Sequence, residues 1–112
     1  MKAYAQALDL KNDPEIIEKY KEHHRNVWPE VVGSLRETGI TGMKIYLSGN
    51  HLFMYFEAVD DFDPARDFQG YTEQNPRADE WNTLMSSSQQ KTPEAGPDDW
   101  WAPMELVYDL NW

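Results

Sequence analysis

The sequence contains no cysteine. A disulfide framework, a thiolate metal site and a cysteine nucleophile are therefore all excluded. Basic residues are also scarce, because 10 Lys and Arg stand against 20 Asp and Glu, which gives a formal net charge of -10. A chain this acidic is repelled by nucleic-acid phosphates and by anionic membrane surfaces. We therefore expect neither as a partner, and we expect a neutral or cationic substrate.

The sequence also lacks a long hydrophobic run. Residues 1–10 mix alanine and leucine with polar side chains, so they show no evident signal peptide or membrane span. We expect a soluble, cytoplasmic protein. Its 112 residues predict one domain, residues 1–112. Five Trp and six Tyr supply large side chains for a core.

Hydrophobic spacing predicts a mixture of strands and helices. The predicted strands cover residues 1–10, 40–47, 51–59 and 104–110. The predicted helices cover residues 14–25, 29–38, 64–70 and 76–85. Asp13 and Pro14 are typical of a helix start, and Gly39 is typical of a helix end. The polar residues 86–99 contain two prolines and a glycine, which predicts a loop or lid.

This order of elements is a β-α-β-β-α-β plan, the ferredoxin-like arrangement of the α+β class. Helices cover one face of such a sheet and leave the other open. In the strand 51–59, Leu52, Met54 and Phe56 alternate with Phe53 and Tyr55, so both faces are apolar or aromatic. We therefore expect a C2 homodimer in which the open faces of two copies pack together.

Tyr20 and His24 lie four residues apart on a predicted helix and so share one face. The pKa of histidine suits proton transfer near neutral pH, and a neighbouring phenol can donate a hydrogen bond to a sugar oxygen. The alternative is an ordinary helical stripe in which Tyr20 packs and His24 bonds a backbone carbonyl.

A metal site is not expected. His23 and His24 are adjacent, and adjacent residues of a helix point about 100° apart. His51 is the only other histidine, and there is no cysteine to complete a ligand set.

Several tryptophans have two interpretations each. Trp28, which precedes a proline, fits a core side chain at a helix break or an aromatic wall against a sugar. Trp81 has the helical spacing of core packing. Trp100 and Trp101 follow the polar loop and fit either a dimer contact or the rim of a pocket.

Taken together, these patterns resemble the L-rhamnose mutarotase family. The run 20–30 has the pattern Y-x-x-x-H-x-x-x-W-P-E. The hairpin 45–57, the pair Trp81 and Met85, and the closing segment 104–108 are similar and occur in the same order. The resemblance covers residues 1–57 and 81–110.

The resemblance implies a dimeric α/β barrel that interconverts the anomers of a 6-deoxy-L-sugar without a cofactor. It implies that His24 is the catalytic acid and that Tyr20 and Tyr46 contact the substrate. A tryptophan pair of the rhamnose enzymes falls on Trp81 and Asn82, so only Trp81 is retained. Asn82 offers hydrogen bonds where an indole would offer a flat apolar wall.

Mutarotation moves one proton onto the ring oxygen and another off the C1 hydroxyl, and nothing is oxidised. By the resemblance, His24 handles one of these protons, Tyr20 and Tyr46 orient hydroxyls, and Trp28 or Trp81 stacks on the sugar face. We expect L-rhamnose as the substrate, with L-fucose or another 6-deoxy sugar as the alternative. A cofactor-free monooxygenase with an apolar pocket and a non-catalytic sugar-binding protein also remain open.

Overall fold

The computed structural model describes residues 2–97 and 99–112, so Met1 and Asp98, which belong to the predicted first strand and loop, lie outside the described residues. The elements in chain order are β1 Lys2–Leu10, α1 Pro14–Arg25, α2 Pro29–Glu37, β2 Ile40–Ser48, β3 His51–Ala58, α3 Pro64–Gln74, α4 Pro76–Ser86, β4 Gln89–Gln90 and β5 Ala102–Pro103. None of the described helices is long and apolar enough to cross a membrane.

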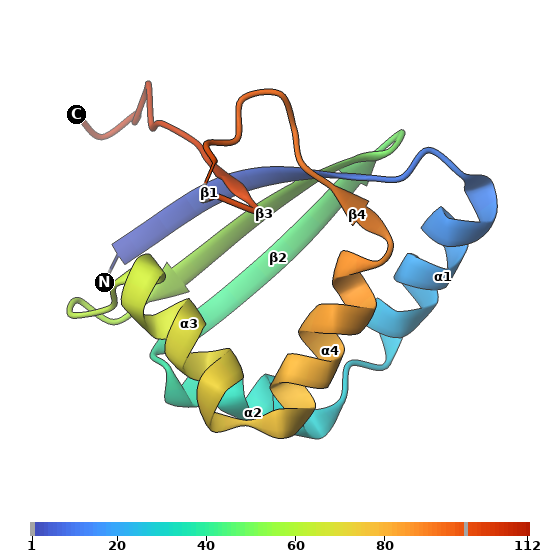
Figure 1. Cartoon of the computed structure of the whole chain (residues 1–112). Helices are drawn as coiled ribbons and strands as arrows, with labels where there is room; N and C mark the ends of the chain where they lie inside the picture. Colours follow the sequence, from blue (N-terminus) through green and yellow to red (C-terminus); the bar gives the residue numbers. More distant parts are fainter. Residues whose placement is uncertain (1, 98) are drawn as a thin grey trace.

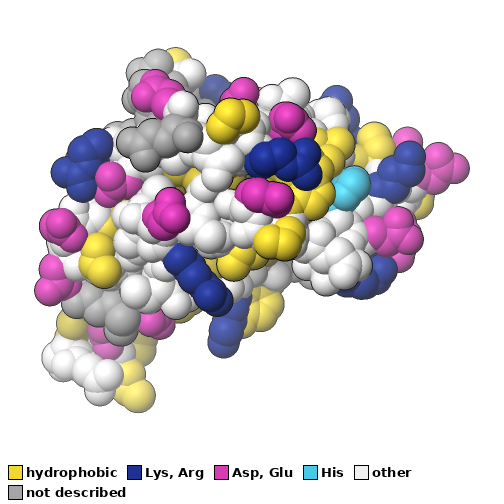
Figure 2. Space-filling view, turned by 90° about the horizontal axis from the view of Figure 1, so that it is seen from below, with side chains coloured by type: hydrophobic (Ala, Val, Ile, Leu, Met, Phe, Trp, Pro, Cys, Tyr) yellow, Lys and Arg dark blue, Asp and Glu magenta, His cyan; other side chains and the backbone are white. Residues whose placement is uncertain are grey.

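The strands form one antiparallel sheet in the order β2-β3-β1-β4, and β5 pairs with β1 beside β4. Figure 1 shows the four helices gathered on one side of this sheet. The predicted α+β, ferredoxin-like arrangement is confirmed. The charged side chains visible from the helical side carry both signs, with hydrophobic side chains between them (Figure 2).

The helices begin where the sequence predicts. Asp13 caps α1, because its Oδ1 accepts a hydrogen bond of 2.9 Å from the backbone N–H of Glu15. Asn75 caps α4 in the same way, with its Oδ1 3.0 Å from the N–H of Arg77. Both caps are followed by a proline in the first turn, where its missing N–H costs nothing. These caps fix the two helices that flank the cavity described below.

Gly39 joins α2 to β2 in a conformation that other residues rarely adopt. Its φ is +108°, and a Cβ added there would lie 2.7 Å from Cγ2 of Val59. The Gly39 carbonyl also accepts a hydrogen bond of 2.9 Å from the N–H of Val59. The predicted helix end at Gly39 is therefore confirmed, and it brings the start of β2 against the end of β3.

The core lies between the inner face of the sheet and the helices. Leu8 pairs with Leu52 and Tyr4 with Phe56 across β1 and β3, so their side chains share the inner face. Buried side chains of α1, α2, α3 and α4 complete one cluster with Leu10 and Leu52, and Phe62 completes a second with Phe56.

Three predicted elements differ from the structure. The predicted loop 86–99 contains the short strand β4, in which Gln89 and Gln90 pair with β1. The helix predicted at 64–70 continues to Gln74, because one interior glycine costs a helix only about 1 kcal/mol. The strand predicted at 104–110 is wrong. The strand formed here is Ala102–Pro103, the Met104 N–H adds one hydrogen bond of 2.9 Å to the Ala5 carbonyl, and residues 105–112 then leave the sheet. The apolar pattern there has no core to meet within the chain, since Leu106 and Val107 are 66% and 78% exposed.

The outer face of the sheet is not covered by any helix. Phe53 and Tyr46 point outward and are 36% and 57% exposed, with their rings 6.2 Å apart. By the strand register, Ala7 lies opposite Phe53 on the same face. The prediction that β3 is apolar on both faces is therefore confirmed.

Candidate active site

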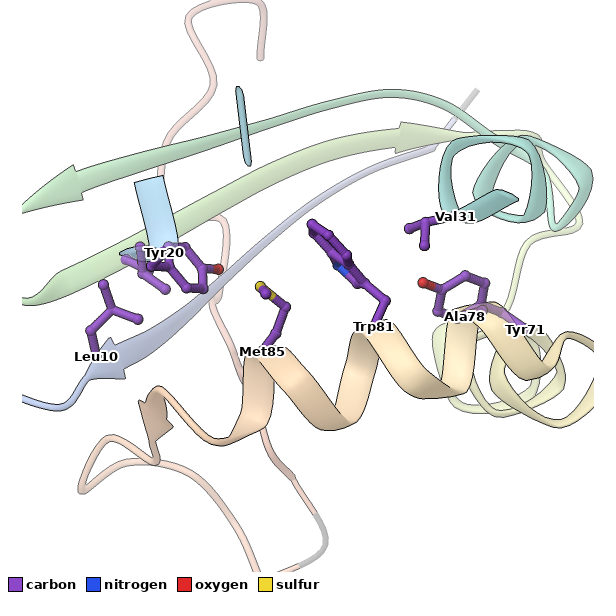
Figure 3. Close-up of a cluster of buried hydrophobic side chains, with 8 residues drawn as sticks. Leu10, Tyr20, Val31, Tyr71, Ala78, Trp81 and Met85 are labelled. Atoms are coloured by element: carbon purple, nitrogen blue, oxygen red, sulfur yellow. The ribbon is translucent and has the colours of Figure 1, made fainter. Parts of the chain in front are cut away.

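A cavity of about 780 Å³ lies between the inner face of the sheet, α1, α4 and residues 99–103. Its volume is typical of a small-molecule site. Figure 3 shows Trp81 and Met85 projecting from α4 into the space beneath the sheet, where Tyr20 of α1 also lies. The lining residues with polar or aromatic side chains are Gln6, Tyr20, His24, Phe68, Tyr71, Thr72, Trp81, Asn82, Ser86, Gln89, Asp99, Trp100 and Trp101.

Tyr20 is almost completely buried, with 4% of its surface exposed. Its ring stacks on that of His24 at 4.2 Å between centroids and 29° between planes. Burial raises the pKa of the phenol to about 12, and a hydrogen bond from Gln89 opposes part of this rise. Tyr20 therefore keeps its proton near neutral pH and can donate a hydrogen bond to a ligand in the cavity.

His24 has one ring nitrogen committed to the backbone. Its Nδ1 lies 2.9 Å from the carbonyl oxygen of Tyr20, one helical turn earlier. A carbonyl can only accept, so we assign the proton of the neutral ring to Nδ1 and the lone pair to Nε2. Burial lowers the pKa of His24, and the nearby His23 lowers it further, while the bond to Tyr20 works in the opposite direction. The ring is therefore neutral near pH 7 and is a base.

Trp81 closes the cavity beside the histidine. It is 7% exposed and meets His24 edge to face at 5.6 Å. Trp28 packs against the other side of Trp81 at 5.1 Å, and the guanidinium carbon of Arg77 lies 3.9 Å from the centroid of the Trp28 ring. Trp28 does not line the cavity. Trp81 and Arg77 contact its ring, as expected of a packed side chain, and its contact with a sugar stays a prediction.

Asn82 follows Trp81 on α4 and lines the cavity with an exposed side chain. The structure thus brings together four of the predicted residues, namely Tyr20, His24, Trp81 and Asn82. An amide at this place provides both a donor and an acceptor for sugar hydroxyls.

Tyr46 lies outside this group. A register shift between Ile40 and Gly42 precedes Met43 and Ile45, which line the cavity from the inner face. Side chains alternate along a strand, so Tyr46 points to the outer face. Tyr46 therefore does not line this cavity, and its contact with a substrate stays a prediction.

Sequence reasoning missed two glutamines of the cavity. Gln6 has the inward register on β1, and its Nε2 donates to the Met54 sulfur at 3.1 Å. Its place between Tyr4 and Leu8 in an alternating strand was a usable signal. Gln89 offered no such signal, because it lies in a polar run of Ser and Gln.

The tryptophan pair after the polar loop belongs to the cavity. Trp100 and Trp101 both line it, as expected for the rim of a pocket. Asp99 joins them from the same segment. Among residues 2–97 and 99–112, no group of three or more His, Asp and Glu could hold a metal ion.

The family of the chain follows from comparison with known proteins. The family model for L-rhamnose mutarotase matches residues 3–110. This chain belongs to the L-rhamnose mutarotase family. Membership places it among the sugar mutarotases, which are isomerases.

Individual relatives agree with this placement. The chain is 34% identical to an L-fucose mutarotase of Xanthomonas campestris pv. campestris, across 99% of this chain and 90% of that protein. It is 59% identical to a UPF0734 protein of Dictyostelium discoideum, across 99% of this chain and 91% of that protein. A solved L-rhamnose mutarotase of Formosa agariphila has the same fold, with a TM-score of 0.70 at 23% identity, covering 98% of this chain and 99% of that one.

Proposed function

We propose that this protein interconverts the α and β anomers of a 6-deoxy-L-hexose, with His24 as its proton-transfer group. The observation that carries the proposal is a neutral imidazole stacked on a buried phenol at the wall of a sugar-sized cavity. The polar groups of Tyr20, His24, Asn82 and Gln89 favour a polyol over the apolar ligand of a monooxygenase.

The chemistry needs one base and one acid. Nε2 of His24 takes the proton of the C1 hydroxyl while the electron pair of the bond between C1 and the ring oxygen moves to that oxygen. The ring oxygen takes a proton from the Tyr20 hydroxyl. After C1 rotates, both transfers reverse as the ring recloses, so no oxidant or cofactor is consumed. Positioned acid–base catalysis of this kind contributes about 10²- to 10⁴-fold.

L-Fucose is the preferred substrate of the proposal, and L-rhamnose is the second candidate. Both sugars carry the C6 methyl group and the same C1 chemistry, and they differ in the hydroxyls at C2 and C4. The 34% identical relative acts on L-fucose, whereas the solved L-rhamnose mutarotase is 23% identical. Asn82 beside Trp81 offers a hydrogen bond whose fit depends on the configuration of a sugar hydroxyl, which is the property in which the two sugars differ.

Polarimetry on a freshly dissolved single anomer tests the proposal. Crystalline α-L-fucose and α-L-rhamnose would be dissolved with catalytic amounts of protein, and α-D-glucose would serve as the control sugar. We expect the optical rotation of one or both 6-deoxy sugars to reach equilibrium faster in proportion to the protein concentration. Decay at the buffer rate for both sugars would overturn the proposed activity.

The proposal includes a homodimer formed through the outer face of the sheet. Phe53 and Tyr46 expose aromatic rings there, and the tail 104–112 adds exposed Leu106 and Val107. Exposed apolar side chains of this size are typical of an interface when they lie together, as the Tyr46 and Phe53 rings do. We expect sedimentation velocity at micromolar concentration to give a dimer, and Phe53→Glu to give a monomer. A monomeric wild-type protein would contradict the pairing.

A further inference from the structure

Gln89 connects the tryptophan segment to the tyrosine of the site. Its Oε1 accepts a hydrogen bond of 2.8 Å from Nε1 of Trp100, and its Nε2 lies 3.4 Å from the hydroxyl oxygen of Tyr20. Gln89 is 6% exposed, so this amide sits where water does not compete for its hydrogen bonds. Three segments far apart in the sequence therefore meet at one side chain.

The direction of these bonds follows from the chemistry of the groups. An indole N–H can only donate, so the oxygen of the Gln89 amide must face Trp100. The NH₂ group of Gln89 must then face Tyr20, where the phenol oxygen accepts. A hydroxyl that already accepts from Gln89 keeps its own hydrogen for another partner.

The cavity supplies that partner. Tyr20, Gln89 and Trp100 all line it. Burial keeps Tyr20 protonated, and the bond from Gln89 partly offsets the rise in the phenol pKa. Hydrogen bonds of catalytic groups are often long without substrate and shorten when it binds, so a distance of 3.4 Å fits a contact that tightens with a sugar in place.

We propose that Gln89 is a positioning residue of the mutarotase site: fixed by Trp100, it donates to the Tyr20 oxygen and thereby aims the Tyr20 hydroxyl hydrogen at the ring oxygen of the sugar. The inference rests on the proposed function and goes beyond it. In this proposal the segment that carries Trp100 helps Tyr20 to protonate the ring oxygen. His24, which takes the proton of the C1 hydroxyl, does not depend on this segment.

The backbone supports this role. Gln89 lies in β4, where it pairs with Leu10 at the end of β1. Its neighbour Gln90 pairs with Asp9 and is exposed, so it provides a matched control on the same short strand. Gln89 is therefore held by the sheet, independently of α1, and can act as a fixed reference for the phenol.

The first test compares anomer exchange of ¹³C1-labelled L-fucose and L-rhamnose in four variants. Gln89→Leu removes the donor to Tyr20, and we expect it to lower kcat about five- to tenfold, the effect of one lost hydrogen bond. Trp100→Phe keeps an aromatic ring but removes the N–H that fixes the amide, and we expect a smaller loss in the same direction. Gln90→Leu should exchange the sugars as the wild type does. Tyr20→Phe removes the group that Gln89 orients.

A double-mutant cycle separates positioning from a general structural effect. If Gln89 acts through Tyr20, then Gln89→Leu has little further effect on kcat in the Tyr20→Phe background. A full additional loss there, or a Gln89→Leu variant with wild-type kcat, would overturn the proposal.

The ζ-carbon NMR resonance of Tyr20 provides a second readout that needs no sugar. Its assignment follows from its absence in Tyr20→Phe. We expect its chemical shift to change in Gln89→Leu and Trp100→Phe and to stay the same in Gln90→Leu. An unchanged chemical shift in Gln89→Leu would show that Gln89 makes no hydrogen bond to Tyr20. If the resonances shift as expected but the wild type exchanges neither sugar, the proposed function fails and the reaction role of Gln89 fails with it. If the wild type exchanges sugar and Gln89→Leu does so equally well, only the role of Gln89 fails.

Discussion

Two aromatic clusters lie beneath the same sheet and differ in the polar atoms that they contain. We define the site cluster as Tyr20, His24 and Trp81, and the phenylalanine cluster as Phe56, Phe62 and Phe68. The phenylalanine rings meet edge to face at 5.5 to 5.8 Å, a geometry shared with the contact of Trp81 and His24 at 5.6 Å. Ring packing alone therefore does not distinguish a core from a site.

The difference lies in the polar atoms and their partners. Phe56 and Phe62 are 1% exposed and carry no atom that needs a hydrogen bond. In the site cluster, the imidazole bonds the backbone at Nδ1 and the phenol meets Gln89. Among the described residues, each of these two groups keeps one hydrogen-bonding position without a partner, which is Nε2 on His24 and the hydroxyl hydrogen on Tyr20. The phenylalanine cluster contributes apolar packing alone, whereas the site cluster is the one for which we propose chemistry, because its polar atoms are only partly satisfied by the described residues.

The largest expected effect is the loss of anomer exchange when the imidazole of His24 is removed. His24→Ala should reduce the protein-dependent exchange rate by about 10²- to 10⁴-fold, because the base is lost. The free energy of unfolding of His24→Ala should stay close to that of the wild type, although its exchange rate falls. His23→Ala is the matched control, since His23 is the neighbouring residue and does not line the cavity. Equal exchange by His24→Ala and the wild type, measured by NMR, would remove His24 from the mechanism.

Truncating the phenylalanine cluster should have the opposite pattern. Phe56→Ala should lower the free energy of unfolding by about 3–5 kcal/mol, because the residue is fully buried. Urea unfolding followed by tryptophan fluorescence measures this loss. Val32→Ala, on an exposed position of α2, should stay within about 0.5 kcal/mol of the wild type. If Phe56→Ala were as stable as Val32→Ala, the phenylalanine cluster would not be a main source of the stability of the fold.

The pH dependence sharpens the role of the base. Burial lowers the pKa of His24 below its ordinary value of 6.5, and His24 acts in its neutral form. The exchange rate should therefore be at its plateau at pH 7 and fall about tenfold per pH unit only well below pH 6.5, once His24 is protonated. For the same reason the folded state should lose stability as the pH falls from 6.5 through this lowered pKa, because the unfolded state binds the proton more tightly. A rate that halves above pH 6.5 would contradict a neutral, buried His24.

The smallest expected effect concerns the helix that carries Trp81. Asn75→Ala removes the side-chain cap of α4 and the hydrogen bond of Asn75 to Ser34, so unfolding should become easier by about 1 kcal/mol. Thermal unfolding measures the change, and Asn75→Asp, which keeps the capping oxygen, should recover part of it. Exchange by the folded fraction should be unaltered, since Asn75 does not line the cavity.

The sequence predicted the parts of the molecule that depend on local spacing. Asp13 and Pro14 mark α1, and the four-residue spacing of Tyr20 and His24 places both on one face. The structural interpretation of this pair is confirmed, because Tyr20 packs in the core and His24 bonds a backbone carbonyl. Both residues also line the cavity, and their role in proton transfer stays a prediction.

Features that depend on distant partners were not predictable in the same way. Strand alternation places Tyr46 on the face opposite Ile45, but the sequence of β2 does not say which of the two faces the helices cover. The bond between Gln89 and Tyr20 spans 69 positions in the sequence. The pattern of 104–110 shows that the tail is apolar, but not that this part of the chain pairs with β1 earlier, at Ala102–Pro103. Local sequence patterns predict where helices and strands begin and end. Contacts between distant segments determine which face of a strand is covered and which side chains bond one another.

The measurement that tests the central claim most directly is exchange NMR on equilibrated L-fucose and L-rhamnose. The α anomeric proton is saturated, and transfer to the β signal is recorded without protein, with the wild type and with His24→Ala. We expect transfer with the wild type in at least one sugar and almost none with His24→Ala. Absence of transfer with the wild type in both sugars, or equal transfer with His24→Ala, would contradict a mutarotase site built on His24.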